Sequence, residues 1–248
     1  MRHGLIYLFI VCSAAIAAQG AEVNVAVAAN FAAPMQKIAA DFERDTGYKT
    51  ALSFGSTGNF YNQIKSGAPF ELLLAADGRT PARLEVEGLA AGGTRFTYAI
   101  GRLALWSSQA DFVDAEGQVL QSDRFDRIAL ANPKLAPYGA AAVETLTRLG
   151  LLDRLQTKFV QGENVAQAYQ FVATGNAPLG FVALAQIYAD GLITHGSAWI
   201  VPTILHAPIQ QDAVLLTNGM NNPAAAALIT YLQGDTARAI ICTYGYEC

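Results

Sequence analysis

Charged side chains are scarce in this sequence. Asp, Glu, Lys and Arg together make up 15% of its 248 residues, the formal net charge is −4, and the lysines and arginines form no run. A broad basic face is therefore not expected, and nucleic acid is not an expected partner. Hydrophobic residues make up 52% of the chain. This composition excludes a disordered protein and predicts one or two compact lobes with a sizeable core.

The sequence also lacks the motifs of common enzymes and metal sites. It contains no Gly-x-Ser-x-Gly elbow, no phosphate-binding loop with its lysine and no His-Glu-x-x-His. His195 and His206 are isolated from each other and from any cysteine pair with metal spacing. We therefore expect no catalysis, no cofactor and no resident metal. A secreted hydrolase that uses Ser56 or Thr57 as its nucleophile stays open as an alternative, although no base is evident.

No segment is long enough to be a membrane span, but residues 1–20 have the features of a signal peptide. Arg2 and His3 give a short basic start, an apolar stretch runs from Leu5 to Ala18, and residues 18–20 fit the small-x-small pattern. The apolar stretch is shorter than the ~20 residues that cross a bilayer. We expect cleavage before Ala21 and export of the mature chain.

Cysteine is rare as well. Removal of the signal peptide would remove Cys12 and leave Cys242 and Cys248. In an oxidising compartment such a pair favours a disulfide that closes a small loop at the C-terminus. The alternative is two free thiols at a frayed end.

Strand-like and helix-like segments alternate along the mature chain. The expected strands are Val23–Val27, Thr50–Phe54, Glu71–Ala75, Arg127–Leu130, Lys158–Val160, Leu179–Val182 and Ile209–Leu216. The expected helices end at Gly47, Gly67 and Gly88, and others span Gly139–Leu149, Val165–Thr174, Ala224–Leu232 and Thr236–Cys242. This alternation predicts an α/β protein whose sheets are mostly parallel and flanked by helices.

A long β-rich stretch, Arg95–Ser107, and a second, apolar stretch, Ala198–Pro202, are expected to cross between two lobes. We therefore predict one lobe from residues 22–98 with 204–248, and a second lobe from residues 99–203. Two crossings make a hinge, and a ligand is expected in the crevice where the carboxyl ends of the strands meet.

Four short stretches turn the chain directly into a helix and carry almost no charge: 29–31, 55–58, 136–139 and 163–165. A helix N-terminus offers unpaired N–H groups and about +0.5 charge, so it can hold an anion without Lys or Arg. The side-chain amide of Asn30 and the hydroxyls of Ser56 and Thr57 are further candidate donors. Taken singly, each residue is more often a helix cap or a packing residue. If the four ends converge, they form a cage for a small tetrahedral oxyanion.

Longer motifs add to this interpretation. They are Ala28–Phe31, Ser53–Gly58, Gly67–Phe70, Arg95–Ser107, Asn132–Pro133 with Pro137–Gly139, and Leu179–Gln186. Across the whole mature chain the sequence resembles the periplasmic molybdate-binding proteins of ABC transporters, members of the two-lobed solute-binding protein superfamily. The stretch from Tyr98 to Ser107 is the most specific part of the resemblance.

The resemblance implies a site of neutral donors at Asn30 with Ala29 beside it, at Thr57, and at the backbones of Tyr138 and Val165. Molybdenum would enter only as its oxyanion, with no protein atom bound to the metal. Some members have Ser at the first position and Tyr where this chain has Ala183, so one tyrosine donor is absent here or is replaced by Tyr138.

The resemblance further implies a periplasmic, monomeric receptor. Its ligand would be molybdate and also tungstate, its partner a membrane permease, and it would need no cofactor. A receptor of the same fold for sulfate, phosphate or an organic anion is one alternative. A receptor that signals through a membrane partner is another.

Overall fold

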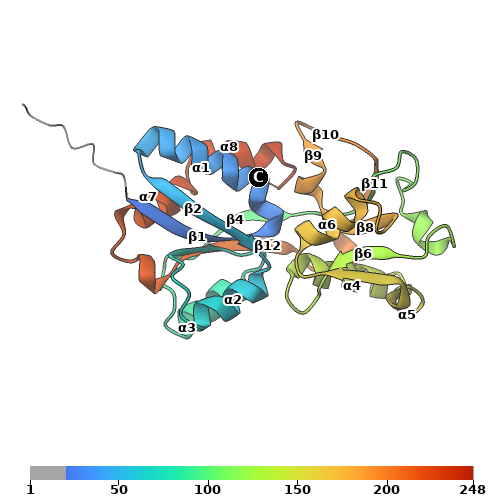
Figure 1. Cartoon of the computed structure of the whole chain (residues 1–248), viewed down its shortest axis with the longest axis horizontal. Helices are drawn as coiled ribbons and strands as arrows, with labels where there is room; N and C mark the ends of the chain where they lie inside the picture. Colours follow the sequence, from blue (N-terminus) through green and yellow to red (C-terminus); the bar gives the residue numbers. More distant parts are fainter. Residues whose placement is uncertain (1–20, 248) are drawn as a thin grey trace, which may run out of the picture.

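The computed structural model describes residues 21–247; the predicted signal peptide and Cys248 lie outside this range. The described chain forms two lobes that lie side by side, each built on a five-stranded sheet (Figure 1). We call the lobe that contains both ends of the described chain lobe I and the other lobe II.

The sheet of lobe I has the strand order β2-β1-β3-β12-β4. Its strands are β1 (Glu22–Ala28), β2 (Lys49–Gly55), β3 (Leu72–Leu74), β4 (Phe96–Gly101) and β12 (Ile209–Leu215), and its helices are α1 (Ala32–Thr46), α2 (Thr57–Lys65), α3 (Arg79–Val86), α7 (Pro223–Tyr231) and α8 (Asp235–Thr243). β1 pairs in parallel with β2 and β3, whereas β12 is antiparallel to β3 and β4.

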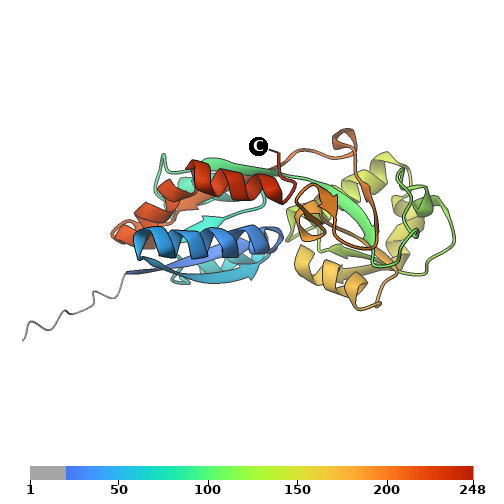
Figure 2. The same cartoon turned by 90° about the horizontal axis from the view of Figure 1, so that it is seen from above.

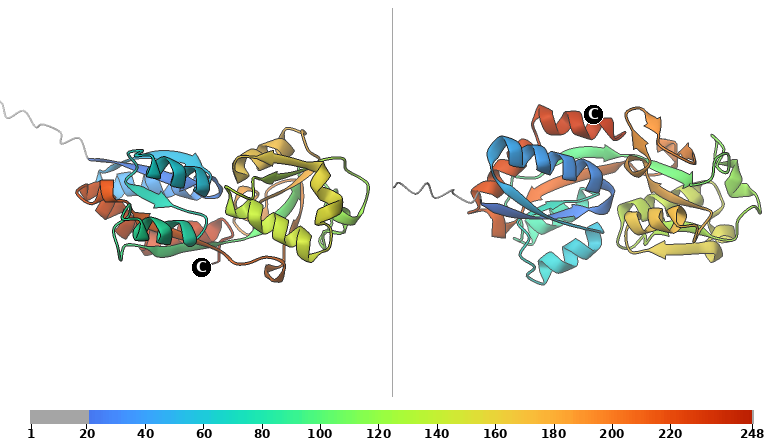
Figure 3. Two further views of the ribbon diagram at one scale, coloured as in Figure 1. Left: turned by 90° about the horizontal axis from the view of Figure 1, so that it is seen from below. Right: turned by 45° about the horizontal axis from the view of Figure 1, so that its top comes forward.

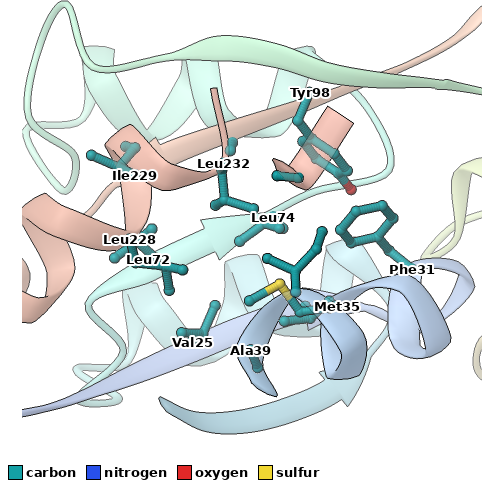
Figure 4. Close-up of a cluster of buried hydrophobic side chains, with 14 of the residues drawn as sticks. Val25, Phe31, Met35, Ala39, Leu72, Leu74, Tyr98, Leu228, Ile229 and Leu232 are labelled. Atoms are coloured by element: carbon teal, nitrogen blue, oxygen red, sulfur yellow. The ribbon is translucent and has the colours of Figure 1, made fainter. Parts of the chain in front are cut away.

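Alternate residues of these strands pack in two separate hydrophobic cores, because successive side chains of a strand point to opposite faces of the sheet. Val25 and Leu74 pack with α1, α7 and α8, as Figure 4 shows for part of this cluster. Ala26 and Leu73 pack on the other face with residues of α2 and α3. Helices thus cover both faces of the sheet, which explains why its inner strands β1 and β3 are mostly apolar and buried.

Lobe II repeats this plan with the strand order β11-β5-β8-β6-β7. Its strands are β5 (Leu103–Ser107), β6 (Ile128–Ala131), β7 (Phe159–Gly162), β8 (Leu179–Ala183) and β11 (Ser197–Ile200); a hairpin of β9 (Tyr188–Ala189) and β10 (Leu192–Ile193) lies outside the sheet. Its helices are α4 (Pro137–Arg148), α5 (Leu152–Leu155) and α6 (Val165–Ala173). Short 3₁₀ turns occur at Ala29–Phe31 (η1), Gln118–Gln121 (η2), Gln156–Lys158 (η3), Leu184–Gln186 (η4), Thr203–Leu205 (η5) and Thr217–Gly219 (η6).

The predicted fold class is confirmed, because each sheet is mostly parallel and carries helices on both faces. The sequence analysis did not predict α5, which is a single turn too short to show helical periodicity. It also treated Ala198–Pro202 only as a crossing, whereas Ser197–Ile200 is the edge strand β11 of lobe II.

The chain passes between the lobes twice. The first passage is at Arg102, between β4 and β5, and the second is the segment 201–208 before β12. Figure 2 shows the green and brown segments crossing together, and the left view of Figure 3 shows both along one edge of the molecule. We keep the division at residues 98/99 and 203/204 as a proposal, and note that β4 continues to Gly101 before the chain changes sheet.

Within residues 21–247, the structure has no helix that combines the length and the apolar character needed to cross a bilayer.

Candidate ligand-binding site

The four helix starts singled out in the sequence meet around one small cavity between the lobes. Its lining residues are Ala28, Ala29, Asn30, Gly55, Ser56, Thr57, Ala76, Ala136, Pro137, Tyr138, Asn164 and Val165. All six predicted site residues, Ala29, Asn30, Ser56, Thr57, Tyr138 and Val165, are among them. The volume of this cavity is about 10 Å³. Pockets for drug-sized ligands have volumes of ~300–1,000 Å³, so this cavity suits only a much smaller guest.

The hydroxyl groups of lobe I are oriented as donors. The Thr57 Oγ1 accepts a hydrogen bond from the backbone N–H of Ala76 at 2.9 Å. The Ser56 Oγ caps helix α2 by accepting from the N–H of Asn59 at 3.4 Å. A hydroxyl that accepts in this way still has its own hydrogen to donate. Ser56 and Thr57 are both buried beside the cavity, so their hydrogens can serve a guest there.

Lobe II contributes backbone N–H groups. Tyr138 follows Pro137 at the start of α4, and Val165 is the first residue of α6. Asn164 caps α6 by accepting from the N–H groups of Ala166 and Gln167 at 3.0 and 3.1 Å, which leaves that of Val165. Within residues 21–247 the N–H groups of Tyr138 and Val165 have no hydrogen-bond acceptor. Unpaired N–H groups at two helix N-termini produce a positive potential in the cavity.

No residue of the described chain that lines the cavity carries a charged side chain. The carboxylate of Asp77, next to the lining residue Ala76, accepts instead from the N–H of Thr80 at 2.7 Å. The cavity therefore combines donors, positive helix ends and no formal charge. Such a site suits a small anion whose oxygen atoms can accept hydrogen bonds from several directions.

Asn30 is placed at the cavity, but its side-chain amide is not turned to a guest. Its Nδ2 donates to Gln211 Oε1 at 2.7 Å and to the Tyr246 hydroxyl at 3.1 Å. These two bonds use both amide hydrogens, because a buried amide needs partners for its polar atoms. What Asn30 offers to the cavity is thus the backbone at the start of η1 and not the amide expected from the sequence.

Tyr138 likewise presents its backbone and not its hydroxyl. Its phenol oxygen accepts from Gln211 Nε2 at 3.2 Å. Burial raises the pKa of Tyr138 well above its usual value, and burial also raises the pKa of Tyr98 and Tyr246. The three phenols therefore remain neutral at physiological pH. Ala183, at the end of β8, does not line the cavity.

The lobes touch at the mouth of the cavity. The N–H of Gly58, at the second position of α2, donates to the carbonyl of Leu135 in lobe II at 2.9 Å. This bond joins the segment after Thr57 to the segment before Tyr138, so the structure has the closed arrangement of the lobes.

The sequence analysis included Asn164 in the stretch 163–165 but gave it no role, and it missed the polar residues Gln211 and Tyr246 behind the cavity. A signal for Gln211 was present, because Gln211 and Asp212 follow the exposed Gln210 and are polar residues inside a strand whose other residues are apolar. Both are fully or almost fully buried. Buried polar side chains in a strand indicate a hydrogen-bonding role.

Two other predictions concern metal binding and the terminal disulfide. No group of three or more metal-ligating side chains exists within residues 21–247. Cys242 lies in α8, and because Cys248 is outside the described residues the Cys242–Cys248 disulfide stays a prediction.

Two known proteins are similar to this chain over almost its whole length. The molybdate-binding protein ModA of Azotobacter vinelandii is 59% identical over 232 residues, which cover 94% of this chain and 92% of that protein. The molybdate-binding protein ModA of Rhodobacter capsulatus is 46% identical over 246 residues, which cover 99% of this chain and 96% of that protein.

Solved structures and family profiles lead to the same group. The structure of the periplasmic molybdate-binding protein of Azotobacter vinelandii matches with a TM-score of 0.88 at 41% identity, covering 91% of this chain and 99% of that one. The profile of the bacterial extracellular solute-binding proteins matches residues 23–247. The chain therefore belongs to the bacterial extracellular solute-binding proteins, in the group that contains the ModA molybdate-binding proteins.

Proposed function

We propose that this protein is the receptor that binds molybdate between its two lobes and delivers it to the membrane permease of an ABC transporter. Tungstate, which is nearly the same size and carries the same charge, is the second expected ligand. The names and the extent of the similar proteins support the ligand class. The observation that carries the proposal is the small, uncharged cavity in which four helix starts meet.

The chemistry of this cavity matches a buried dianion. Removing such an ion from water costs several kcal/mol or more unless its oxygens are hydrogen-bonded. The hydroxyls of Ser56 and Thr57 and the N–H groups of Tyr138 and Val165 are available for this purpose. Hydrogen bonds to a charged acceptor are about twice as strong as those between neutral groups. Because the donors belong to helix ends and tight turns, little reorganisation is needed when the ion arrives.

Selectivity against sulfate follows from size, because both ions are tetrahedral dianions. A cage formed around the larger molybdate leaves the smaller sulfate with stretched hydrogen bonds, and N–H···O bonds weaken beyond ~3.2 Å. Molybdate and tungstate are expected to bind with similar affinity. Nothing in the described residues gives Ser56 or Thr57 a base, since the partners of both hydroxyls are backbone N–H groups; we propose a binding protein and not a hydrolase.

Isothermal titration calorimetry and native mass spectrometry of the purified mature protein test the proposal. The expected result is one molybdate or tungstate per chain, with sulfate and phosphate binding much more weakly. Tighter binding of sulfate or phosphate than of molybdate would refute it. The same spectra report the mass of the chain, and so test the proposed cleavage before Ala21 and the proposed monomer.

A further inference from the structure

Behind the cavity, five buried polar side chains form one hydrogen-bonded cluster around Gln211. Its members are Asn30, Tyr98, Tyr138, Gln211 and Tyr246. Gln211 lies in β12 and is fully buried. Its Oε1 is 2.7 Å from Asn30 Nδ2 and 2.9 Å from the Tyr98 hydroxyl, and its Nε2 is 3.2 Å from the Tyr138 hydroxyl.

The orientation of the Gln211 amide is fixed by these partners. Oε1 faces the Asn30 Nδ2 group, which can only donate, so Oε1 must be the acceptor there. Nε2 is then directed to Tyr138, whose oxygen has a free lone pair. A reversed amide would place two donors against each other, and a buried donor without an acceptor is costly. Gln211 therefore links Asn30 to Tyr138 in one defined geometry.

This link joins the two lobes. Asn30 and Gln211 belong to lobe I, whereas Tyr138 is the second residue of α4 in lobe II. Tyr138 thus has two roles at once, because its N–H faces the cavity while its hydroxyl contacts lobe I. Asn30 is held by the same glutamine and by Tyr246, whose hydroxyl also donates to the Asn30 carbonyl at 2.9 Å.

The cluster lies directly at the first chain crossing. A Cβ atom on Gly101, the last residue of β4, would be 2.2 Å from the Tyr138 hydroxyl and 2.4 Å from Gln211 Nε2. The absence of a side chain at Gly101 is therefore what allows the Gln211–Tyr138 contact to form. A rotation of lobe II about the crossings would change this contact together with the cavity.

We propose that Gln211 is a positioning residue of the oxyanion site, and that its bond to Tyr138 couples closure of the lobes to the placement of Asn30 at the cavity. This inference rests on the proposed function. Gln211 does not line the cavity; it acts through Asn30 and Tyr138. The bond belongs to the closed form, so it slows the escape of a bound oxyanion.

The test uses Tyr138→Phe, Gln211→Met and the double variant, with molybdate as the ligand. Tyr138→Phe keeps the backbone N–H and the ring but loses the contacts of the hydroxyl with Gln211 and Tyr246. The dissociation rate of molybdate, followed by tryptophan fluorescence in stopped flow, is expected to rise about fivefold in Tyr138→Phe. Gln211→Met is expected to raise it at least about tenfold, since Asn30 also loses a partner. The matched control is Tyr231→Phe, which removes a phenol that donates to Asp45 on the surface of lobe I and should leave the rate unchanged.

The double variant separates coupling from general damage. If Tyr138 acts through Gln211, the double variant releases molybdate no faster than Gln211→Met, because the bond is already absent. The inference would be overturned if the rate increases of the two single variants multiply in the double variant. It would also be overturned if Tyr138→Phe leaves the dissociation rate unchanged. Tyr138→Phe alone decides the matter if Gln211→Met does not fold. A wild-type protein that does not bind molybdate refutes the proposed function instead, so the two failures are distinguishable.

Discussion

Replacement of Gly58 by alanine tests whether contact between the lobes at the mouth of the cavity contributes to binding. A Cβ atom at this position would be 3.0 Å from both the Cα and the carbonyl oxygen of Leu135, and 3.3 Å from its Cδ2. The first two are backbone atoms, which cannot rotate away. Ordinary contact begins at 3.4 Å, so the lobes must separate there by about 0.4 Å.

The expected loss of affinity follows from this shift. The Gly58 N–H donates to the same Leu135 carbonyl at 2.9 Å, and a shift of about 0.4 Å would stretch that bond past the ~3.2 Å limit of good N–H···O geometry. A net hydrogen bond contributes ~0.5–1.5 kcal/mol, so molybdate binding should weaken about three- to tenfold.

The ligand-free protein should respond in the opposite direction. Gly58 is in the first turn of α2, and alanine is favoured over glycine in a helix by up to ~1 kcal/mol. The melting temperature without ligand should therefore stay equal or rise while affinity falls. Calorimetry measures the dissociation constant, and a thermal melt measures stability. Gly92→Ala is the matched control, because a Cβ atom added there would have no other atom within 4 Å. An unchanged dissociation constant in Gly58→Ala would refute the reasoning.

Three further predictions concern the cavity and the second crossing. Thr57→Ala should weaken molybdate binding by ~1–3 kcal/mol in calorimetry, because the donor is lost and the Ala76 N–H loses its acceptor, while Thr57→Ser should retain most of the affinity. Affinity should change less than about twofold between about 0.02 and 0.5 M NaCl, since screening acts mainly on exposed charges; a steep fall would indicate a basic site. Hydrogen bonds from the N–H of Ala207 and from Arg148 lower the pKa of Glu144 below its usual value of 4.5. The stability that this carboxylate contributes is therefore complete above pH 4.5 and is lost as the pH falls through the lowered pKa. The melting temperatures of wild type and Glu144→Gln should accordingly converge in acid and separate towards neutral pH.

Local patterns were enough to predict the fold and the helix starts of the site. Alternating apolar runs and helix-ending glycines such as Gly47 are set by residues that are neighbours in the sequence, so the sequence alone predicts them. The same holds for the turn at residues 55–58. The strand β11 was missed because four residues at a sheet edge resemble any apolar connection.

Long-range pairs could not be predicted in this way. Asn30 meets Gln211 and Tyr246, which are 181 and 216 residues further along the chain. No periodicity links such positions. The sequence therefore placed Asn30 correctly beside the cavity but assigned its amide to the guest, whereas burial commits that amide to partners from the end of the chain.

The position of β12 affects the order in which the protein can fold. It lies between β3 and β4 in the first sheet, yet it is made only after every strand of the second. As the polypeptide is synthesised, lobe II can complete its sheet while lobe I still has a gap among its inner strands. Strand β12, in the last fifth of the chain, then fills this gap and joins the edge strand β4 to β3. Truncation a few dozen residues before the end would therefore leave one half native and the other unable to assemble.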